Sequence, residues 1–113
     1  MSAITTHILD TSRGQPARGV LVVLERRAEG RHEELGRGVT DADGRLRTLL
    51  AQGVPAPRGV YRLTFHTGDY FAQLGGEGFY PEVTIAFEIK DPAQHYHVPL
   101  LLNPFGYSTY RGS

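Results

Sequence analysis

Two histidines separated by one residue, His95 and His97, are the side chains in this sequence best suited to do chemistry. Residues two apart on a β-strand point to the same face of the strand. Tyr96 and Val98 take the opposite face and are typical of a core, so we expect the histidines to point away from it. A neutral imidazole accepts protons near pH 7, which suits the activation of water in a hydrolysis. Exposed strand histidines without a role are the alternative.

His7 and Arg45 are the next candidates for the same chemistry. Isoleucines mark one face of the predicted first strand, and His7 falls on the other face. Arg45 directly follows the sequence Asp41-Ala42-Asp43-Gly44, which is typical of a turn capped by aspartate side chains. A guanidinium beside a histidine favours the neutral imidazole and stabilises an oxyanion. A lone strand histidine and a surface arginine without function stay open as alternatives.

The end of the chain carries side chains that a dispensable tail would not need. Residues 106–113 include two tyrosines and an arginine, and they follow directly on the strand that bears the histidines. Chain ends fray unless something holds them, and dispensable tails tend to be small and polar. We therefore expect this segment to belong to a site, although a final strand that completes a sheet is the alternative.

Other kinds of catalytic site are disfavoured. The sequence has no cysteine, which excludes thiolate sites, and it lacks a nucleophile elbow, a P-loop and a dinucleotide fingerprint. Three histidines are compatible with zinc, but no carboxylate adjoins the His95 and His97 pair to orient it. Arg45 and Arg111 would also oppose a dication if they lie close. We expect no metal and water as the nucleophile.

The composition limits the partners and the location of the protein. Twelve Lys and Arg balance twelve Asp and Glu in 113 residues, so there is no basic stripe for nucleic acid. The longest apolar runs, such as residues 20–24, have five residues and are too short to span a bilayer. The first residues have no charged and apolar pattern of a secretory signal. These absences predict a cytoplasmic protein without nucleic-acid or membrane partners.

The hydrophobic pattern has a period of two, which predicts β-strands. The length predicts a single domain over residues 1–113, and short strands separated by turn signals indicate an antiparallel β-sandwich. One short helix is expected over residues 69–75, with Asp69 near its N-cap and Gly75 at its end. The predicted strands cover residues 4–10, 20–24, 32–40, 60–66, 82–90 and 95–103.

Five blocks of the sequence carry a resemblance to a known family. The Tyr-Arg-Gly-Ser ending is the most specific of them. The blocks are Thr6 to Thr11, Thr40 to Arg45, Phe79 to Val83, His95 to Leu102 and Tyr110 to Ser113. Over the whole chain they resemble the 5-hydroxyisourate hydrolases, the transthyretin-related enzymes of urate breakdown. Asn103 stands where serine is common and Tyr80 where phenylalanine is common, and neither lies on a catalytic position.

The resemblance implies a fold, an assembly and an activity. It implies a transthyretin-like β-sandwich of two roughly four-stranded sheets with one short helix. It implies a homotetramer, a dimer of dimers with active sites in a central channel. The implied reaction is hydrolysis of 5-hydroxyisourate to 2-oxo-4-hydroxy-4-carboxy-5-ureidoimidazoline, in purine degradation, without a cofactor.

The resemblance also implies roles for individual residues, matched motif by motif. One of two histidines activates water, and which of them is the base stays open, as does the role of His95. An arginine orients the substrate, and the tail binds it or holds the water. The implied catalytic residues are His7, Arg45, His97 and Ser113, and the implied substrate-binding residues are His7, Arg45, Tyr110 and Arg111.

A transthyretin-like carrier of small ligands, without catalytic activity, is the alternative function. Such a carrier lacks the Tyr-Arg-Gly-Ser ending and the histidine pattern, and this chain has both. A carrier would also need an apolar channel, whereas histidine, arginine and tyrosine make a polar one.

Overall fold

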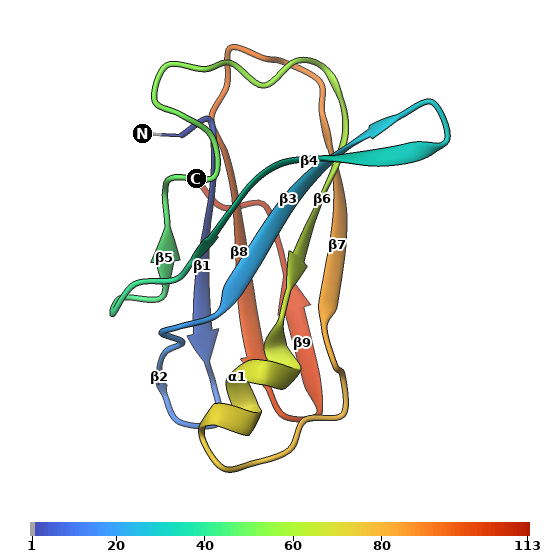
Figure 1. Ribbon diagram of the computed structural model, residues 1–113. Coiled ribbons are helices and arrows are strands. Elements are labelled where there is room, and N and C mark those ends of the chain that lie inside the picture. Colours follow the sequence, from blue (N-terminus) through green and yellow to red (C-terminus); the bar gives the residue numbers. More distant parts are fainter. Residues whose placement is uncertain (1) are drawn as a thin grey trace.

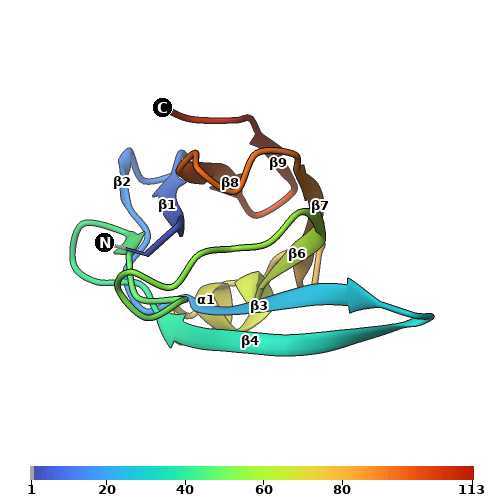
Figure 2. The same ribbon diagram turned by 90° about the horizontal axis from the view of Figure 1, so that it is seen from above.

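Two β-sheets face each other in the computed structural model, which describes residues 2–113 (Figures 1 and 2). The first sheet has the order β2-β1-β8-β9 with β5 also paired to β1, and the second has the order β4-β3-β6-β7. The strands of the first sheet are β1 (Ile4–Asp10), β2 (Gln15–Pro16), β5 (Arg45–Leu46), β8 (Tyr96–Asn103) and β9 (Gly106–Thr109). Those of the second are β3 (Leu21–Ala28), β4 (Arg31–Val39), β6 (Gly59–Phe65) and β7 (Val83–Ile89), and the helix α1 (Thr67–Gln73) follows β6. The expected sandwich with one short helix is confirmed.

One pair of neighbouring strands is parallel, which the sequence did not predict. β1 and β8 run in the same direction, with Thr5 opposite His97 and His7 opposite Pro99, whereas every other pair within residues 2–113 is antiparallel. Parallel strands need a long connection, and most of the chain lies between these two. This register places the strand that carries His7 beside the strand that carries His97.

The core confirms the predicted alternation of side chains. In β6, Tyr61, Leu63 and Phe65 are fully buried. In β8 the buried apolar residues are Tyr96, Val98, Leu100 and Leu102. His97 lies on the other face of β8 and is only half-buried. The histidine face of this strand therefore points out of the sandwich, as predicted.

The helix and the tail differ from the predicted boundaries. The helix begins at Thr67 rather than Asp69, and no side chain caps it. Tertiary contacts set its start, because Thr67 is buried and the N–H of Gly68 donates to the carbonyl of Pro81 at 3.0 Å. In the tail, residues 106–109 form the edge strand β9, so a final strand does complete the sheet there. Of the tail that the sequence predicted to belong to a site, only residues 110–113 lie beyond this edge strand.

Two glycines of β4 allow the segment that follows Arg45 to lie against the second sheet. A Cβ atom at Gly36 would overlap the carbonyl oxygen of Leu49, and one at Gly38 would lie 2.8 Å from the Leu46 side chain. A side chain at Gly36 would force the backbone apart, whereas one at Gly38 would require the end of the Leu46 side chain to move. The close approach therefore fixes the segment that carries Arg45 and Arg47.

We expect Gly36→Ala to lower the free energy of unfolding by about 1–3 kcal/mol, because the added methyl group forces backbone apart. Urea denaturation measures the change. Gly76→Ala is the matched control, since a Cβ there would meet nothing closer than the carbonyl oxygen of Phe71 at 3.8 Å. Equal urea midpoints for the two variants would show that the approach of Gly36 to Leu49 does not constrain the fold.

Candidate active site

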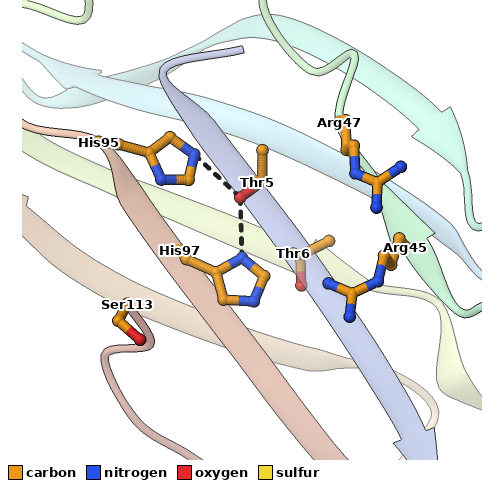
Figure 3. Close-up of a pocket in the computed structure, with 7 residues that line it drawn as sticks. All are labelled: Thr5, Thr6, Arg45, Arg47, His95, His97 and Ser113. Carbon is orange, nitrogen blue, oxygen red and sulfur yellow. Dashed lines mark hydrogen bonds between the residues drawn. The ribbon is translucent and has the colours of Figure 1, made fainter. Parts of the chain in front are cut away.

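A pocket of about 290 Å³ opens on the outer face of the first sheet, over β1 and β8 (Figure 3). The seven residues that line it come from the beginning, the middle and the end of the chain, and apart from the two threonines and one serine all are histidine or arginine. They are Thr5, Thr6, Arg45, Arg47, His95, His97 and Ser113. Three of the four implied catalytic residues, Arg45, His97 and Ser113, are thus brought together.

Thr5 links the two histidines of the His-x-His motif. Its Oγ1 lies 2.8 Å from Nδ1 of His97 and 3.1 Å from Nε2 of His95. The two imidazole rings are nearly parallel, with centroids 6.4 Å apart and an interplanar angle of 18°. In Figure 3 the second ring nitrogen of His97 points away from Thr5. One hydroxyl therefore holds both rings and leaves Nε2 of His97 free.

The Asp-Gly turn places Arg45 beside His7. Oδ1 of Asp41 accepts hydrogen bonds from the backbone N–H groups of Asp43 at 2.9 Å and Arg45 at 3.0 Å. Gly44 adopts a φ of 73°, which favours glycine, and its carbonyl accepts from the N–H of Ile8 at 2.8 Å. The turn is thereby fastened to β1. His7 and Arg45 are directly paired in the ladder, and His7 lies next to the pocket without lining it.

The surroundings lower the pKa of both histidines. Burial is the largest cause for His97, followed by the positive charges of His95, Arg45 and His7. Burial also leads for His7, followed by Arg45, and these outweigh the opposing influence of Asp41 and Asp43. Both imidazoles are therefore neutral near pH 7 and able to accept a proton.

A close backbone approach brings the end of the chain to His97. The N–H of Gly112 donates to the carbonyl of His97 at 2.9 Å. A Cβ at residue 112 would lie 2.5 Å from Cδ2 of His97, so only glycine fits there. Thr109 fastens the segment further, since its hydroxyl donates to the carbonyl of Pro99 at 2.7 Å. Ser113 is thereby placed at the pocket.

Tyr110 and Arg111 lie elsewhere. They line a second cavity of about 240 Å³, together with residues of β7 and β8. The guanidinium of Arg111 lies 4.4 Å from the ring centroid of Tyr96 and donates to Oε1 of Gln94 at 2.8 Å. Within one subunit these two side chains do not share the pocket of Arg45, and their role in substrate binding stays a prediction.

Three residues that line the pocket were not predicted from the sequence: Thr5, Thr6 and Arg47. Thr5 lies two positions before the candidate His7, and Arg47 lies two positions after the candidate Arg45. Residues two apart share a strand face, so this spacing was a signal for both. Thr6 gave no such signal, because it is buried and its hydroxyl donates to the carbonyl of Val98 at 2.6 Å.

Residues 2–113 show neither a metal centre nor a membrane span. No group of three or more His, Asp or Glu side chains in this range is arranged to hold a metal ion. The one helix described is too short to cross a bilayer.

Comparison with known proteins places the chain in a family. The sequence model of the HIUase/Transthyretin family matches residues 4–112. The chain belongs to this family. A 5-hydroxyisourate hydrolase of Halalkalibacterium halodurans is 49% identical over 115 residues, which cover 97% of each chain. The similarity to this hydrolase thus extends over nearly the full length of the chain, as the sequence motifs predicted.

Two solved structures show the same fold. The 5-hydroxyisourate hydrolase of Klebsiella pneumoniae superposes with a TM-score of 0.88 at 46% identity and covers both chains completely. Transthyretin from Sparus aurata superposes with a TM-score of 0.91 at 30% identity, covering 99% of this chain and 97% of the other. The transthyretin-like fold is confirmed. Of these two proteins, the hydrolase has the higher sequence identity to this chain.

The lowered histidine pKa values make the stability depend on pH. An unfolded imidazole has a pKa near 6.5 and the folded His7 and His97 lie below it, so the unfolded chain binds more protons between these values. We therefore expect the free energy of unfolding to fall as the pH drops below about 6.5. Urea midpoints measured between about pH 7.5 and about pH 5.5 test this.

We expect the free energy of unfolding of His97→Gln to depend less on pH than that of the parent protein, because glutamine does not titrate. His32→Gln, on the β3–β4 hairpin away from the pocket, controls for the loss of an imidazole in itself. A His97→Gln protein that keeps the whole pH dependence of the parent would contradict the assignment to this ring.

Proposed function

We propose that this protein hydrolyses 5-hydroxyisourate to 2-oxo-4-hydroxy-4-carboxy-5-ureidoimidazoline in purine degradation. The observation that carries the proposal is the pocket in which His97 and Arg45 meet, in a chain nearly half identical to proteins named 5-hydroxyisourate hydrolase. Its volume of about 290 Å³ suits a small planar ligand, and its histidines and arginines suit a polar one.

The proposed mechanism is general acid–base hydrolysis by His7 or His97. The neutral imidazole takes a proton from water while the water oxygen adds to a carbonyl carbon of the six-membered ring. Arg45 donates to the substrate oxygens and stabilises the negative charge that develops on the attacked carbonyl. The ring C–N bond then breaks, and the leaving nitrogen receives the proton from the imidazolium. No step of this scheme calls for a cofactor.

Ser113 and the residues before it complete the proposed site. The hydroxyl of Ser113 is a group that can hold the water or a substrate oxygen beside His97. Tyr110 and Arg111 are proposed to bind the planar substrate, as the resemblance implies. Because they line a second cavity in one subunit, this role rests on how subunits assemble.

We propose that the assembly is a cytoplasmic homotetramer, a dimer of dimers. The pocket lies on the outer face of the first sheet, away from the core of its own subunit. Two such faces opposed across a channel would enclose the pockets and exclude bulk water from them. Sedimentation equilibrium of the purified protein tests the number of subunits.

Ligand transport is the second candidate function, because transthyretin from Sparus aurata has the same fold. The cationic lining of the pocket argues against an apolar ligand. The hydrolase is therefore favoured.

We expect His7→Ala, Arg45→Ala and His97→Asn each to lower the turnover of 5-hydroxyisourate by about 10²-fold or more. The ultraviolet decay of freshly made substrate measures it, with the spontaneous decay subtracted. Arg31→Ala is the matched control, because that arginine is exposed on the β3–β4 hairpin. Sedimentation confirms that each variant keeps its assembly. Near-normal turnover in all three site variants would refute these roles.

Removal of Tyr110 to Ser113 separates the enzyme from the carrier. We expect the truncated protein to stay folded, because β9 ends at Thr109, and to lose hydrolysis because Gly112 no longer contacts His97. Circular dichroism and the decay assay measure the two effects. A truncated protein with full activity would exclude the tail from the site, and a carrier would keep its ligand after the truncation.

A further inference from the structure

The hydroxyl of Thr5 lies within hydrogen-bonding distance of two imidazole nitrogens at once, 2.8 Å from His97 and 3.1 Å from His95 (Figure 3). The Thr5 residue is 4% exposed, so this hydroxyl has little access to water. A hydroxyl has one proton to donate and two lone pairs that accept. It can therefore donate to only one of the two rings at a time.

The direction of that single proton determines the tautomer of His97. If Thr5 donates to Nε2 of His95, it accepts from Nδ1–H of His97, and the lone pair of neutral His97 lies on Nε2. If Thr5 donates to Nδ1 of His97, the proton of His97 lies on Nε2. The first arrangement makes His97 a base toward the pocket, and the second makes it an acid.

We propose that Thr5 is a positioning residue that holds resting His97 in the Nδ1–H tautomer and relays a proton between His97 and His95 during hydrolysis. This inference rests on the proposed function and deepens it, because it makes His97 the base. It also gives His95 a role as the group that stores the proton.

The relay balances at each step. Nε2 of His97 first takes a proton from the attacking water, which gives an imidazolium. Its Nδ1 proton then passes to the Thr5 oxygen while the Thr5 proton passes to Nε2 of His95, so the charge moves to His95 and Thr5 is unchanged. When the C–N bond breaks, His97 gives its Nε2 proton to the leaving nitrogen. The relay runs backward at that moment and restores both neutral rings.

The charges around the two rings favour this direction of transfer. His97 is half-buried and faces His7 on β1, Arg45 on β5 and the guanidinium of Arg47 across the pocket. Burial, followed by the positive charges of His95, Arg45 and His7, lowers the pKa of His97, so a proton there is held weakly.

His95 is exposed, so water hydrates a charge on its ring. The guanidinium of Arg111 donates to the backbone carbonyl of His95 at 3.4 Å. Among residues 2–113, no aspartate or glutamate side chain lines the pocket to hold the proton on His97 instead. A charge on the exposed His95 ring is therefore open to water, whereas burial disfavours a charge on His97.

Thr5→Val and Thr5→Ser test the inference as a matched pair, since valine keeps the shape without the hydroxyl and serine keeps the hydroxyl. The ¹⁵N chemical shifts of the His97 ring report its tautomer in the substrate-free protein. We expect Nδ1–H in the parent and in Thr5→Ser, and a shift toward Nε2–H in Thr5→Val. We expect kcat of Thr5→Val to fall at least about tenfold with an altered acid limb of the pH profile and an unchanged KM.

His95→Gln tests the relay without touching the buried threonine. Glutamine can accept the Thr5 hydrogen bond but cannot store a proton, so kcat should fall while the His97 tautomer persists. An unchanged tautomer in Thr5→Val, or parental kcat in Thr5→Val or His95→Gln, would overturn the inference. The tautomer measurement needs no substrate, so a parent protein without hydrolase activity would refute the proposed function and leave the link between Thr5 and the His97 tautomer to be decided separately.

Discussion

The parallel pairing of β1 with β8 is the contact on which the site depends. It places Thr5 beside His97 and His7 beside Pro99, although about 90 residues separate the two strands. The Thr6 hydroxyl, which donates to the carbonyl of Val98, reinforces the same register from the buried face. Because strand faces alternate, a slip of one residue would turn His97 into the core and Val98 toward solvent. The buried apolar face of β8 thus fixes the position of the chemistry on its other face.

The electrostatics of the pocket follow from which charges are placed there. Arginines and histidines line it, and the carboxylates that act on His7, those of Asp41 and Asp43, belong to the turn that holds Arg45. Burial lowers the pKa of both His7 and His97, and the positive charge of Arg45 adds to this effect at each ring, which keeps both imidazoles neutral near pH 7. In the proposed mechanism the same guanidinium stabilises negative charge on the substrate. Under that proposal, one arginine acts on both the base and the oxyanion.

Local patterns in the sequence predicted much of the fold and part of the site. The alternation in β8 predicted that His97 faces outward, and residues 41–44 predicted the turn that precedes Arg45. The bridge from Thr5 to the two histidines was not predictable, because it depends on a parallel pairing that no turn specifies. The separation of Ser113 from Arg111 was equally hidden. It depends on where β9 ends and on how closely Gly112 approaches His97, and both are tertiary contacts.

His97 is held from two sides before any substrate arrives. The Thr5 hydroxyl fixes Nδ1, and the backbone of Gly112 packs against Cδ2 so closely that no side chain fits between them. An imidazole has two nitrogens, and with one of them occupied only Nε2 is left to act on a ligand. If His97 acts as the proposed base, orienting it in advance removes a reorganisation cost from the reaction. The tail is therefore better understood as part of the support of His97 than as a separate arm. This explains why the most distinctive segment of the sequence is placed beside the His-x-His motif, even though its two largest side chains point elsewhere.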